Sequence, residues 1–318
     1  MQFRTQIPIL KSTNPIDYNS KILSIGSCFA ENMAQKFDYF KFQNETNPFG
    51  IIFNAVSIEK LFRRVCQQDF FEEKDVFFHN ERWHSFEVHS DLSNADRQEL
   101  LETLNKAITE THKQLKEASH IIITLGTSWI YRSIQSSEVV ANCHKVPQKQ
   151  FLKELLSVEE IQKSIQNTIN FIQALNPNIN FLYTISPVRH IKDGFIENQV
   201  SKSHLFTALH GILNSKIYNL KLKYFPSYEI MMDELRDYRF YGEDMLHPNQ
   251  IAIDYIWKRF SESYVSENSF LIMKEVDEIQ KSLRHRSFNP ESDQHQKFLA
   301  NLQAKINLLG QKLPHIKF

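Results

Sequence analysis

Two patterns of hydrophobic and polar positions alternate along the first 265 residues. Short apolar runs are typical of buried strands, and longer stretches with an apolar residue every three or four positions are typical of helices. The predicted strands are 21–25, 41–46, 120–125, 180–185 and 228–232. The predicted helices are 28–40, 54–66, 96–117, 158–175, 201–223 and 248–264. This alternation predicts an α/β protein with a mostly parallel sheet covered by helices on both faces.

Two segments depart from this pattern. Residues 76–89 alternate aromatic with polar side chains around Asn80-Glu81, which predicts a β-hairpin inserted between core elements. Residues 266–318 contain two charged, amphipathic stretches, 270–284 and 292–309, and no strand pattern. We therefore expect one domain over 1–265 and a helical extension over 266–318, either packed on the core or serving as a homodimerisation arm.

Composition narrows the class of protein. The 318 residues are 42% hydrophobic and 23% charged, with zero formal net charge, so no overall field favours nucleic acid or an anionic membrane. No stretch approaches the ~20 apolar residues of a spanning helix, and the first residues lack the apolar region of a signal peptide. We expect a cytoplasmic protein. Three cysteines at unpatterned spacing predict neither a disulfide framework nor a zinc site.

The segment Gly26-Ser27-Cys28 is the first candidate for chemistry. It lies where the first predicted strand meets its helix, and the chain has only seven glycines. Gly26 permits a sharp turn, and the amides that open the helix can stabilise a developing oxyanion. Both the hydroxyl of Ser27 and the thiol of Cys28 are therefore placed as a nucleophile would be.

The second candidate is the segment from Asp244 to His247, followed by Pro248 at the start of a predicted helix. An Asp three residues before a His can bind the ring at Nδ1, which sets the tautomer and stabilises the imidazolium. Asp244 could instead cap the helix and leave His247 a surface residue. The presence of Gly-Ser-Cys at the end of the first strand favours the catalytic interpretation.

Together these segments resemble the GSCFA family, whose motif stands here as Gly26-Ser-Cys-Phe-Ala30 and which is grouped with the SGNH/GDSL hydrolases. The resemblance covers about residues 20–260. It includes Asn47-Pro-Phe-Gly50, Leu125-Gly-Thr-Ser-Trp129, Ser186-Pro-Val-Arg-His190 and the segment 238–247. It implies a three-layer α/β/α sandwich with a mostly parallel, five-stranded sheet of the flavodoxin-like SGNH kind. It also implies a nucleophile at the end of the first strand and Asp244 and His247 as its partners.

The chain departs from the hydrolase pattern at the nucleophile. Where those enzymes have Gly-Asp-Ser, this sequence has Gly-Ser-Cys. Aligned without a gap, Cys28 takes the place of the nucleophile; shifted by one residue, Ser27 does. A Cys beside a His readily acts as a thiolate, but a Cys next to Phe29 can equally be a packing residue. We favour Cys28 and keep both residues as candidates.

The resemblance also implies oxyanion donors at Gly50 and Gly126. The asparagine of the hydrolases' Gly-x-Asn is missing, because Thr127 and Ser128 follow Gly126. A hydroxyl of either residue can donate one hydrogen bond, with a less fixed orientation than an amide. Asn54 and Asn142 are alternative donors.

Arg189 and His190 follow the fourth predicted strand, again at the carboxyl edge of the sheet. Arg189 could bind a carboxylate or phosphate with two hydrogen bonds and His190 could assist, or Arg189 could pair with Asp193 at the surface. His84 and Lys202 are weaker candidates. Neither a metal site nor a cofactor is expected, because the chain lacks a second ligand cluster, a phosphate loop and a Rossmann fingerprint.

The leading hypothesis is an esterase that removes an O-acyl group, such as acetyl, from a glycan or small molecule. In it, Ser27 or Cys28 attacks the acyl carbon, His247 is the general base and then acid, and Asp244 orients His247. Two alternatives stay open. One is acyl transfer from a thioester donor, and the other is a non-catalytic ligand-binding protein on the same fold, which the missing asparagine suggests.

Overall fold

A five-stranded parallel sheet forms the centre of the molecule in a computed structural model that describes residues 5–215 and 221–318. Its strands are β1 (Lys21–Gly26), β2 (Gln43–Thr46), β5 (His120–Leu125), β9 (Asn180–Ile185) and β10 (Leu222–Phe225). They lie in the order β10-β9-β5-β1-β2, and every neighbouring pair is parallel. All five strands therefore end at the same edge, where the sequence places its candidate residues.

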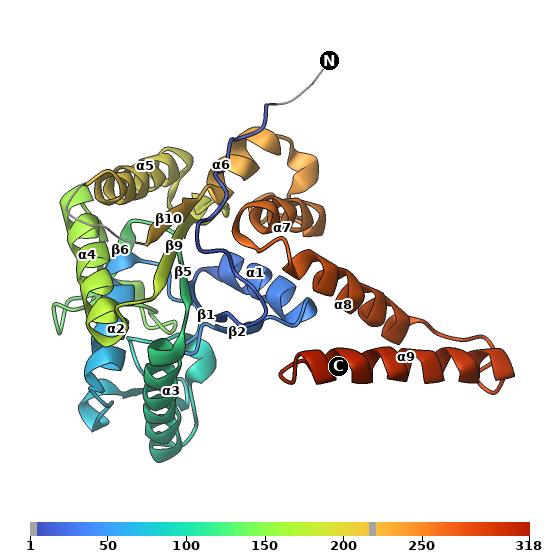
Figure 1. Ribbon diagram of the computed structural model, residues 1–318. Helices are drawn as coiled ribbons and strands as arrows, with labels where there is room; N and C mark the ends of the chain where they lie inside the picture. Colours follow the sequence, from blue (N-terminus) through green and yellow to red (C-terminus); the bar gives the residue numbers. More distant parts are fainter. Residues whose placement is uncertain (1–4, 216–220) are drawn as a thin grey trace.

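Helices cover both faces of this sheet (Figure 1). Successive strand residues point to opposite faces, so that Leu23 packs in one hydrophobic core and Ile22 in the other. The first core is completed by α2 (Ala55–Gln67), α3 (Arg97–Glu117), α4 (Val158–Leu175) and α5 (Phe195–Leu213). The second is completed by α1 (Cys28–Tyr39), α7 (Gln250–Tyr264) and α8 (Ser269–Arg284). The predicted three-layer sandwich is confirmed.

One predicted strand is wrong. Residues 228–232 are helical, because the chain forms α6 (Ser227–Glu229) and a π-helical turn, η5 (Ile230–Glu234), instead. The last strand is β10, which pairs with β9. A short apolar run fits a buried helical turn as well as a buried strand, so periodicity could not separate them. The helix predicted over 201–223 begins earlier and ends at Leu213, and residues 216–220 of that prediction lie outside the described residues.

Two insertions interrupt the alternation of strands and helices. The first contains the predicted hairpin, β3 (Phe77–His79) and β4 (Arg82–His84), whose turn residues Asn80 and Glu81 have φ of 46° and 60°. The second was not predicted. It is a three-stranded antiparallel sheet of β6 (Trp129–Ser133), β7 (Val139–Val140) and β8 (Phe151–Leu155). Short 3₁₀ turns complete the chain: η1 (Glu73–Asp75), η2 (Ser90–Leu92), η3 (Gln148–Gln150), η4 (Ile191–Asp193) and η6 (Tyr238–Phe240).

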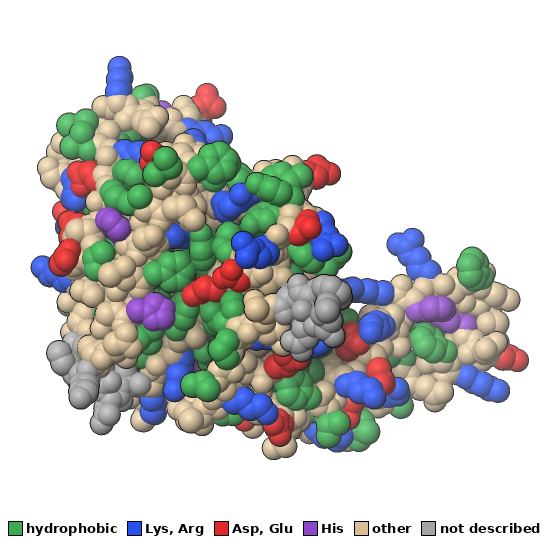
Figure 2. Space-filling model, turned by 90° about the horizontal axis from the view of Figure 1, so that it is seen from above, with side chains coloured by type: hydrophobic (Ala, Val, Ile, Leu, Met, Phe, Trp, Pro, Cys, Tyr) green, Lys and Arg blue, Asp and Glu red, His purple; other side chains and the backbone are tan. Residues whose placement is uncertain are grey.

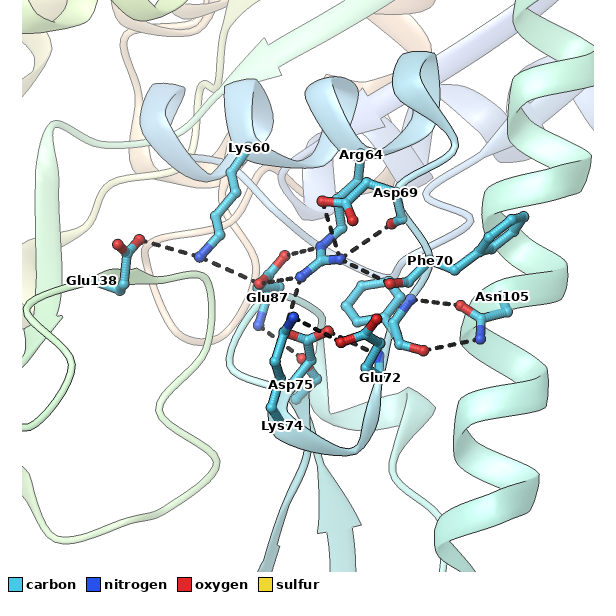
Figure 3. Close-up of polar contacts among 12 residues, drawn as sticks. Lys60, Arg64, Asp69, Phe70, Glu72, Lys74, Asp75, Glu87, Asn105 and Glu138 are labelled. Carbon is cyan, nitrogen blue, oxygen red and sulfur yellow. Dashed lines mark hydrogen bonds and ion pairs between the residues drawn. The ribbon is translucent and has the colours of Figure 1, made fainter.

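A buried ion cluster fastens the first insertion to α2 (Figure 3). The Arg64 guanidinium donates to both carboxylate oxygens of Glu87, at 2.6 and 2.9 Å, and lies 3.2 Å from a carboxylate oxygen of Asp75. Lys60 contacts Glu87 at 3.3 Å and Glu138 of the second insertion at 3.2 Å. We call Lys60, Arg64, Asp75 and Glu87 the Arg64 cluster. Opposite charges satisfy its buried cation, so its role is to fix the insertions to the core.

The C-terminal extension is a helical hairpin of α8 and α9 (Asp293–Lys312). Helix α8 packs on the core, and its Asp277 accepts a hydrogen bond from the Tyr39 hydroxyl at 2.8 Å. Only Leu302 and Leu309 of α9 are buried, and the turn between the helices projects from the body of the molecule (Figures 1 and 2). Of the described helices, none combines the length and the apolar character needed to cross a membrane.

Candidate active site

The turn between β1 and α1 has the geometry that the sequence predicts. Gly26 has a φ of 147°, and a Cβ there would lie 2.3 Å from the carbonyl oxygen of Thr124 on β5. A larger residue would thus be strained and would collide with the neighbouring strand. The Gly26 amide donates to Oδ1 of Asn47, at the end of β2, at 2.8 Å. Both neighbouring strands therefore hold the turn that presents Ser27 and Cys28.

The two candidate nucleophiles differ in exposure. Ser27 is 1% exposed, and its hydroxyl oxygen caps α1 by accepting the Phe29 amide hydrogen at 3.3 Å. Cys28, the first residue of the helix, is only partly buried. Ser27 thus fills the structural position of a helix cap, whereas Cys28 is the more exposed of the two residues.

The surroundings of Cys28 favour the neutral thiol. Burial raises the pKa of Cys28, and the carboxylate of Glu31 raises it further. The amides of Phe29 and Cys28 and the charge of Lys202 act in the opposite direction and lower this pKa. Because the raising effects prevail, the thiol is protonated at neutral pH and needs a base to become a nucleophile.

The contact expected between Asp244 and His247 is present. The Asp244 carboxylate contacts Nδ1 of His247 at 2.5 Å through Oδ2, and its Oδ1 accepts the amide hydrogens of Leu246 and His247 at 2.8 and 3.0 Å. These amide hydrogen bonds and the ring of His247 lower the pKa of Asp244 to about 2. The two side chains are 45% and 47% exposed. Nε2 of His247 is thus left to exchange a proton with a reacting group.

Arg189 holds the loop that carries His247. Its guanidinium donates to the carbonyl of Met245 and lies over the rings of Tyr238 and Tyr241, with its central carbon 5.2 and 4.6 Å from their centroids. Its amide also donates to the carbonyl of Leu246, at 3.4 Å. Met245 has a φ of 58°, unusual for a residue other than glycine. Arg189 therefore stabilises this loop instead of facing open solvent.

The alternative pairing of Arg189 with Asp193 is not found. Asp193 binds Lys153 at 2.6 Å instead. This pair joins η4 to β8 of the second insertion, so the surface turn of which Asp193 is part has a partner of its own.

His190 lies inside the site and is neutral. Its amide donates to Oδ1 of Asn198 at 2.9 Å, and its ring stacks on Phe53 with 5.5 Å between ring centroids. Burial lowers the pKa of His190 to about 3, and the charges of Lys202 and His247 act in the same direction. Its Nε2 is buried without a hydrogen-bond partner among the described residues. His190 thus cannot donate a proton as an imidazolium at neutral pH.

Lys202 links the ends of β5 and β9 at this site. It is 2% exposed, and its Nζ donates to the carbonyl oxygens of Gly126 and Ser186 at 2.7 and 2.8 Å. The Ser27 amide, just after β1, donates to the carbonyl of Thr124 on β5 at 3.3 Å, and the Arg189 amide, after β9, donates to the carbonyl of Leu246 at 3.4 Å. Strand ends from β1, β5 and β9 and the 244–247 loop therefore meet at one site.

Two of the expected oxyanion donors are already occupied. The amide of Gly50 donates to the carbonyl of Asn47 at 2.7 Å, and the amide of Gly126 donates to the carbonyl of Phe53 at 2.8 Å. Asn54 caps α2 through Oδ1, which accepts the Ser57 amide hydrogen at 2.8 Å. Its Nδ2 bonds to no acceptor among residues 5–215 and 221–318. Of Gly50, Gly126 and Asn54, only Asn54 thus keeps a hydrogen-bond donor, its Nδ2, without an acceptor among the described residues.

The hydroxyls of Thr127 and Ser128 face the interior. The Ser128 hydroxyl donates to the carbonyl of Ser201 at 2.7 Å, and the Thr127 hydroxyl lies 2.8 Å from the Ser201 hydroxyl. Oδ1 of Asn142 accepts the amide hydrogen of His144 at 2.8 Å. The contacts of Thr127 and Ser128 bind the end of β5 to α5, and the contact of Asn142 shapes a loop of the second insertion.

Lys202 lies at this site although the sequence made it only a weaker candidate. On α5 it shares a buried face with Leu205 and Leu209, three and seven residues further on. A lysine on the apolar face of a helix is the sequence feature that could have indicated its burial. Among the described residues, no group of three or more His, Cys, Asp or Glu side chains is arranged to hold a metal ion.

Comparisons with known proteins give the family and weak structural similarity. No curated protein matches the chain. A family 3 carbohydrate esterase from Talaromyces cellulolyticus is similar over 80% of this chain and 99% of its own, at 7% identity and a TM-score of 0.36. The acetyl xylan esterase Est2A from the rumen bacterium Butyrivibrio proteoclasticus matches over 85% of this chain and 66% of its own, at 10% identity and a TM-score of 0.38. Because identities and TM-scores are low, we draw nothing about activity from these structures.

The family assignment rests on the sequence itself. Residues 276–318 match the family description "GSCFA domain protein, C-terminal domain". Residues 21–260, which include the β1–α1 turn and the Asp244–His247 pair, match the description "GSCFA family". The chain therefore belongs to the GSCFA family.

Proposed function

We propose that this protein hydrolyses an ester, with Cys28 as the nucleophile, His247 as general base and acid, and Asp244 as the residue that orients His247. The single observation that carries the proposal is the Asp244–His247 contact at the strand-end edge that also presents the partly exposed thiol of Cys28. An imidazole held at Nδ1 by a carboxylate has its Nε2 free to accept a proton. The protonated thiol is the group that needs such a base.

The proposed reaction has two steps. First, Nε2 of His247 takes the thiol proton while sulfur attacks the acyl carbon, and the alcohol then leaves with that proton as a thioester forms on Cys28. Second, water attacks the thioester and gives a proton to Nε2. The acid leaves, and the proton returns to sulfur. The net reaction consumes one ester and one water and releases one acid and one alcohol.

The oxyanion of each step needs hydrogen-bond donors. The amide of Cys28, in the first turn of α1, and Nδ2 of Asn54 are the donors we propose. Asn54 would take the place of the asparagine that the Gly-x-Asn motif supplies in related hydrolases. Phe53 brings this part of the chain against Gly126 and His190, which supports that assignment.

The substrate class we propose is an acetyl or other short acyl ester of a glycan or small molecule. It rests on analogy with ester hydrolases of the superfamily. The test compares the wild type with Cys28→Ala and Ser27→Ala on a panel of nitrophenyl acyl esters. We expect no turnover above background for Cys28→Ala. We expect Ser27→Ala to retain the chemistry but to be less stable by about 1 kcal/mol, the usual cost of losing a helix cap.

The outcomes separate the hypotheses. Full activity in Cys28→Ala with none in Ser27→Ala would transfer the nucleophile to the serine. If the wild type turned over no ester and the folded protein reacted with neither a fluorophosphonate nor iodoacetamide at these two residues, the esterase proposal would fail. A ligand-binding role on this fold would then be the better account.

A further inference from the structure

A groove of about 600 Å³ lies between α1, α7 and α8, which stand next to one another in Figure 1. This volume is within the range of ligand-binding pockets. Asp277 and Arg284 of α8 contribute to its lining, together with residues of α1 and α7. The groove therefore lies where the C-terminal extension meets the α/β domain, and ligands are often bound at such junctions.

One wall of the groove continues from Cys28 along α1. Asn32, Gln35 and Tyr39 line it and follow Cys28 by four, seven and eleven residues, which is the spacing of a single helix face. Asn32 is thus one helical turn from Cys28, and Tyr39 lies about 16 Å further along the helix axis than Cys28. This wall therefore starts beside the candidate nucleophile and leads away from it.

The second wall starts beside His247, since α7 begins at Gln250 three residues later. Gln250 and Trp257 both line the groove, and their spacing of seven residues places them on one face of α7. Helix α7 ends at the opposite edge of the sheet, where Val265 pairs with Ile16 just before β1. The groove thus runs from the edge that carries the proposed site toward the opposite edge, and it extends that site.

The charges along the groove cancel. Its lining includes two cations, Lys36 and Arg284, and two anions, Asp254 and Asp277. Lys36 forms an ion pair with Asp254. A groove without net charge has no field that would attract a phosphate or an acidic polymer, so its electrostatics favour a neutral ligand.

The rest of the lining combines an apolar base with free polar groups. The ring of Trp257 is buried and stacks on Phe40, with 5.7 Å between ring centroids. The side-chain amides of Asn32 and Gln35 bond to no partner among the described residues, and within the same ranges Arg284 makes no ion pair. An amide both donates and accepts hydrogen bonds, as a sugar hydroxyl does, and apolar rings pack against the C–H faces of a sugar.

We propose that this groove binds the sugar residues of a neutral oligosaccharide that carries its ester group at Cys28. The inference rests on the proposed function only for the ester; the groove and its chemistry stand without it. It selects the glycan from the two substrate classes of that proposal, because a small acyl ester would occupy only the site and leave the groove empty. It also gives the C-terminal extension a part in substrate binding, through Asp277 and Arg284 of α8.

The test measures binding without ester turnover. The wild type is applied to an array of neutral oligosaccharides of increasing length, with acidic oligosaccharides of equal length for comparison. The dissociation constant for the best neutral ligand is then measured by calorimetry. We expect a neutral ligand to bind, and affinity to increase with length until the groove is filled.

The variant is Gln35→Ala combined with Arg284→Ala, which removes two exposed polar side chains from the groove. We expect the dissociation constant to rise about 10-fold, as for the loss of one or two hydrogen bonds. The matched control is Arg63→Ala combined with Gln98→Ala, because these exposed residues lie on α2 and α3, over the other face of the sheet. Its dissociation constant should equal that of the wild type.

Hydrogen exchange in the wild type locates the ligand without any variant. The best neutral oligosaccharide should slow exchange in peptides that cover 32–40 and 280–286. Protection confined to other segments, equal affinity in both variants, or binding of no neutral oligosaccharide would each overturn the proposal. Tighter binding of an acidic oligosaccharide than of the neutral one of equal length would contradict the neutral ligand and would also overturn it.

The two proposals fail separately. Binding of a neutral oligosaccharide in the groove by a protein that turns over no ester would support the groove and contradict the esterase. Turnover of acyl esters by a protein that binds no neutral oligosaccharide would contradict only the groove.

Discussion

Two groups of buried charged or titratable side chains differ in how they are paired. In the Arg64 cluster, the carboxylates of Glu87 and Asp75 pair with the guanidinium. Burial alone would raise the pKa of Glu87, but the charges of Arg64 and Lys60 prevail and lower it. Around the site, Nζ of Lys202 binds two carbonyl oxygens and no carboxylate of the described residues, and Nε2 of His190 has no described partner. Complete pairing is what a structural ion cluster needs, whereas incomplete pairing keeps groups ready to respond to charge on a substrate.

The comparison predicts that site variants lose activity and that Arg64 variants lose stability. The largest effect is expected for His247→Ala. Without the general base and acid, kcat/KM on a nitrophenyl ester should fall about 10⁴-fold, or about 5.5 kcal/mol. The free energy of unfolding in urea should stay within about 0.5 kcal/mol of the wild type, because the His247 side chain is 47% exposed. His285→Ala, at the exposed residue that follows α8, is the control. Activity retained by His247→Ala would remove this residue from the mechanism.

The opposite behaviour is expected for Arg64→Met. The side chain is 7% exposed, and its removal leaves Glu87 buried without its main partner. Unfolding in urea should show a loss of about 3–5 kcal/mol, as for other broken buried pairs. Activity per folded molecule should be unchanged, because the cluster lies on α2 and the first insertion.

Arg63→Met is a matched control for this loss, because Arg63 is the exposed neighbour on the same helix. We expect it to cost less than about 0.5 kcal/mol. Equal losses in the two variants would mean that the pairing seen around Arg64 contributes nothing, and the contrast between the two groups would disappear.

Arg189→Met should give an intermediate effect on activity. The 244–247 loop would lose the guanidinium that binds the Met245 carbonyl, while the Asp244–His247 contact would remain. A small displacement of His247 should then lower kcat about 10- to 100-fold, since such displacements cost up to about 10²-fold. Arg236→Met, an exposed residue near the same loop, is the control. If Arg189 instead binds a substrate anion, KM for an anionic ester should rise and kcat for a neutral ester should not fall.

Much of the fold followed from local pattern. The strand 120–125 is buried at every position, and the turn forms at Asn80-Glu81, where Asn80 readily adopts the positive φ of a hairpin turn. The Asp244–His247 contact spans three residues, so spacing alone could predict it. The prediction for 228–232 failed because a five-residue, mostly apolar segment is too short for its periodicity to separate strand from helix.

Contacts between distant residues could not be predicted in this way. Ser128 and Thr127 looked available because nothing in the sequence shows that Ser201, more than seventy residues later, binds both. The same holds for Lys202, because nothing in the sequence shows that its Nζ binds the carbonyl oxygens of Gly126 and Ser186. The sequence thus indicates which residues are candidates for chemistry, while the tertiary contacts decide which of them remain free.

The smallest expected effect is the contribution of the exposed Asp244–His247 pair to the free energy of unfolding. Asp244 has its pKa lowered from 3.8 to about 2 in the folded protein, so its carboxylate stabilises the fold above pH 4 and this contribution is lost as pH falls toward 2. Because the side chain is 45% exposed and screened by solvent, we expect only a few tenths of a kcal/mol. The measurement is the difference in unfolding free energy between the wild type and Asp244→Asn, followed from pH 5 to pH 2. That difference should shrink across this window, whereas Asp233→Asn, an exposed control, should follow the wild type throughout. A loss of several kcal/mol in Asp244→Asn would mean that this pair is structural like the Arg64 cluster, and the distinction between paired and responsive charges would no longer hold.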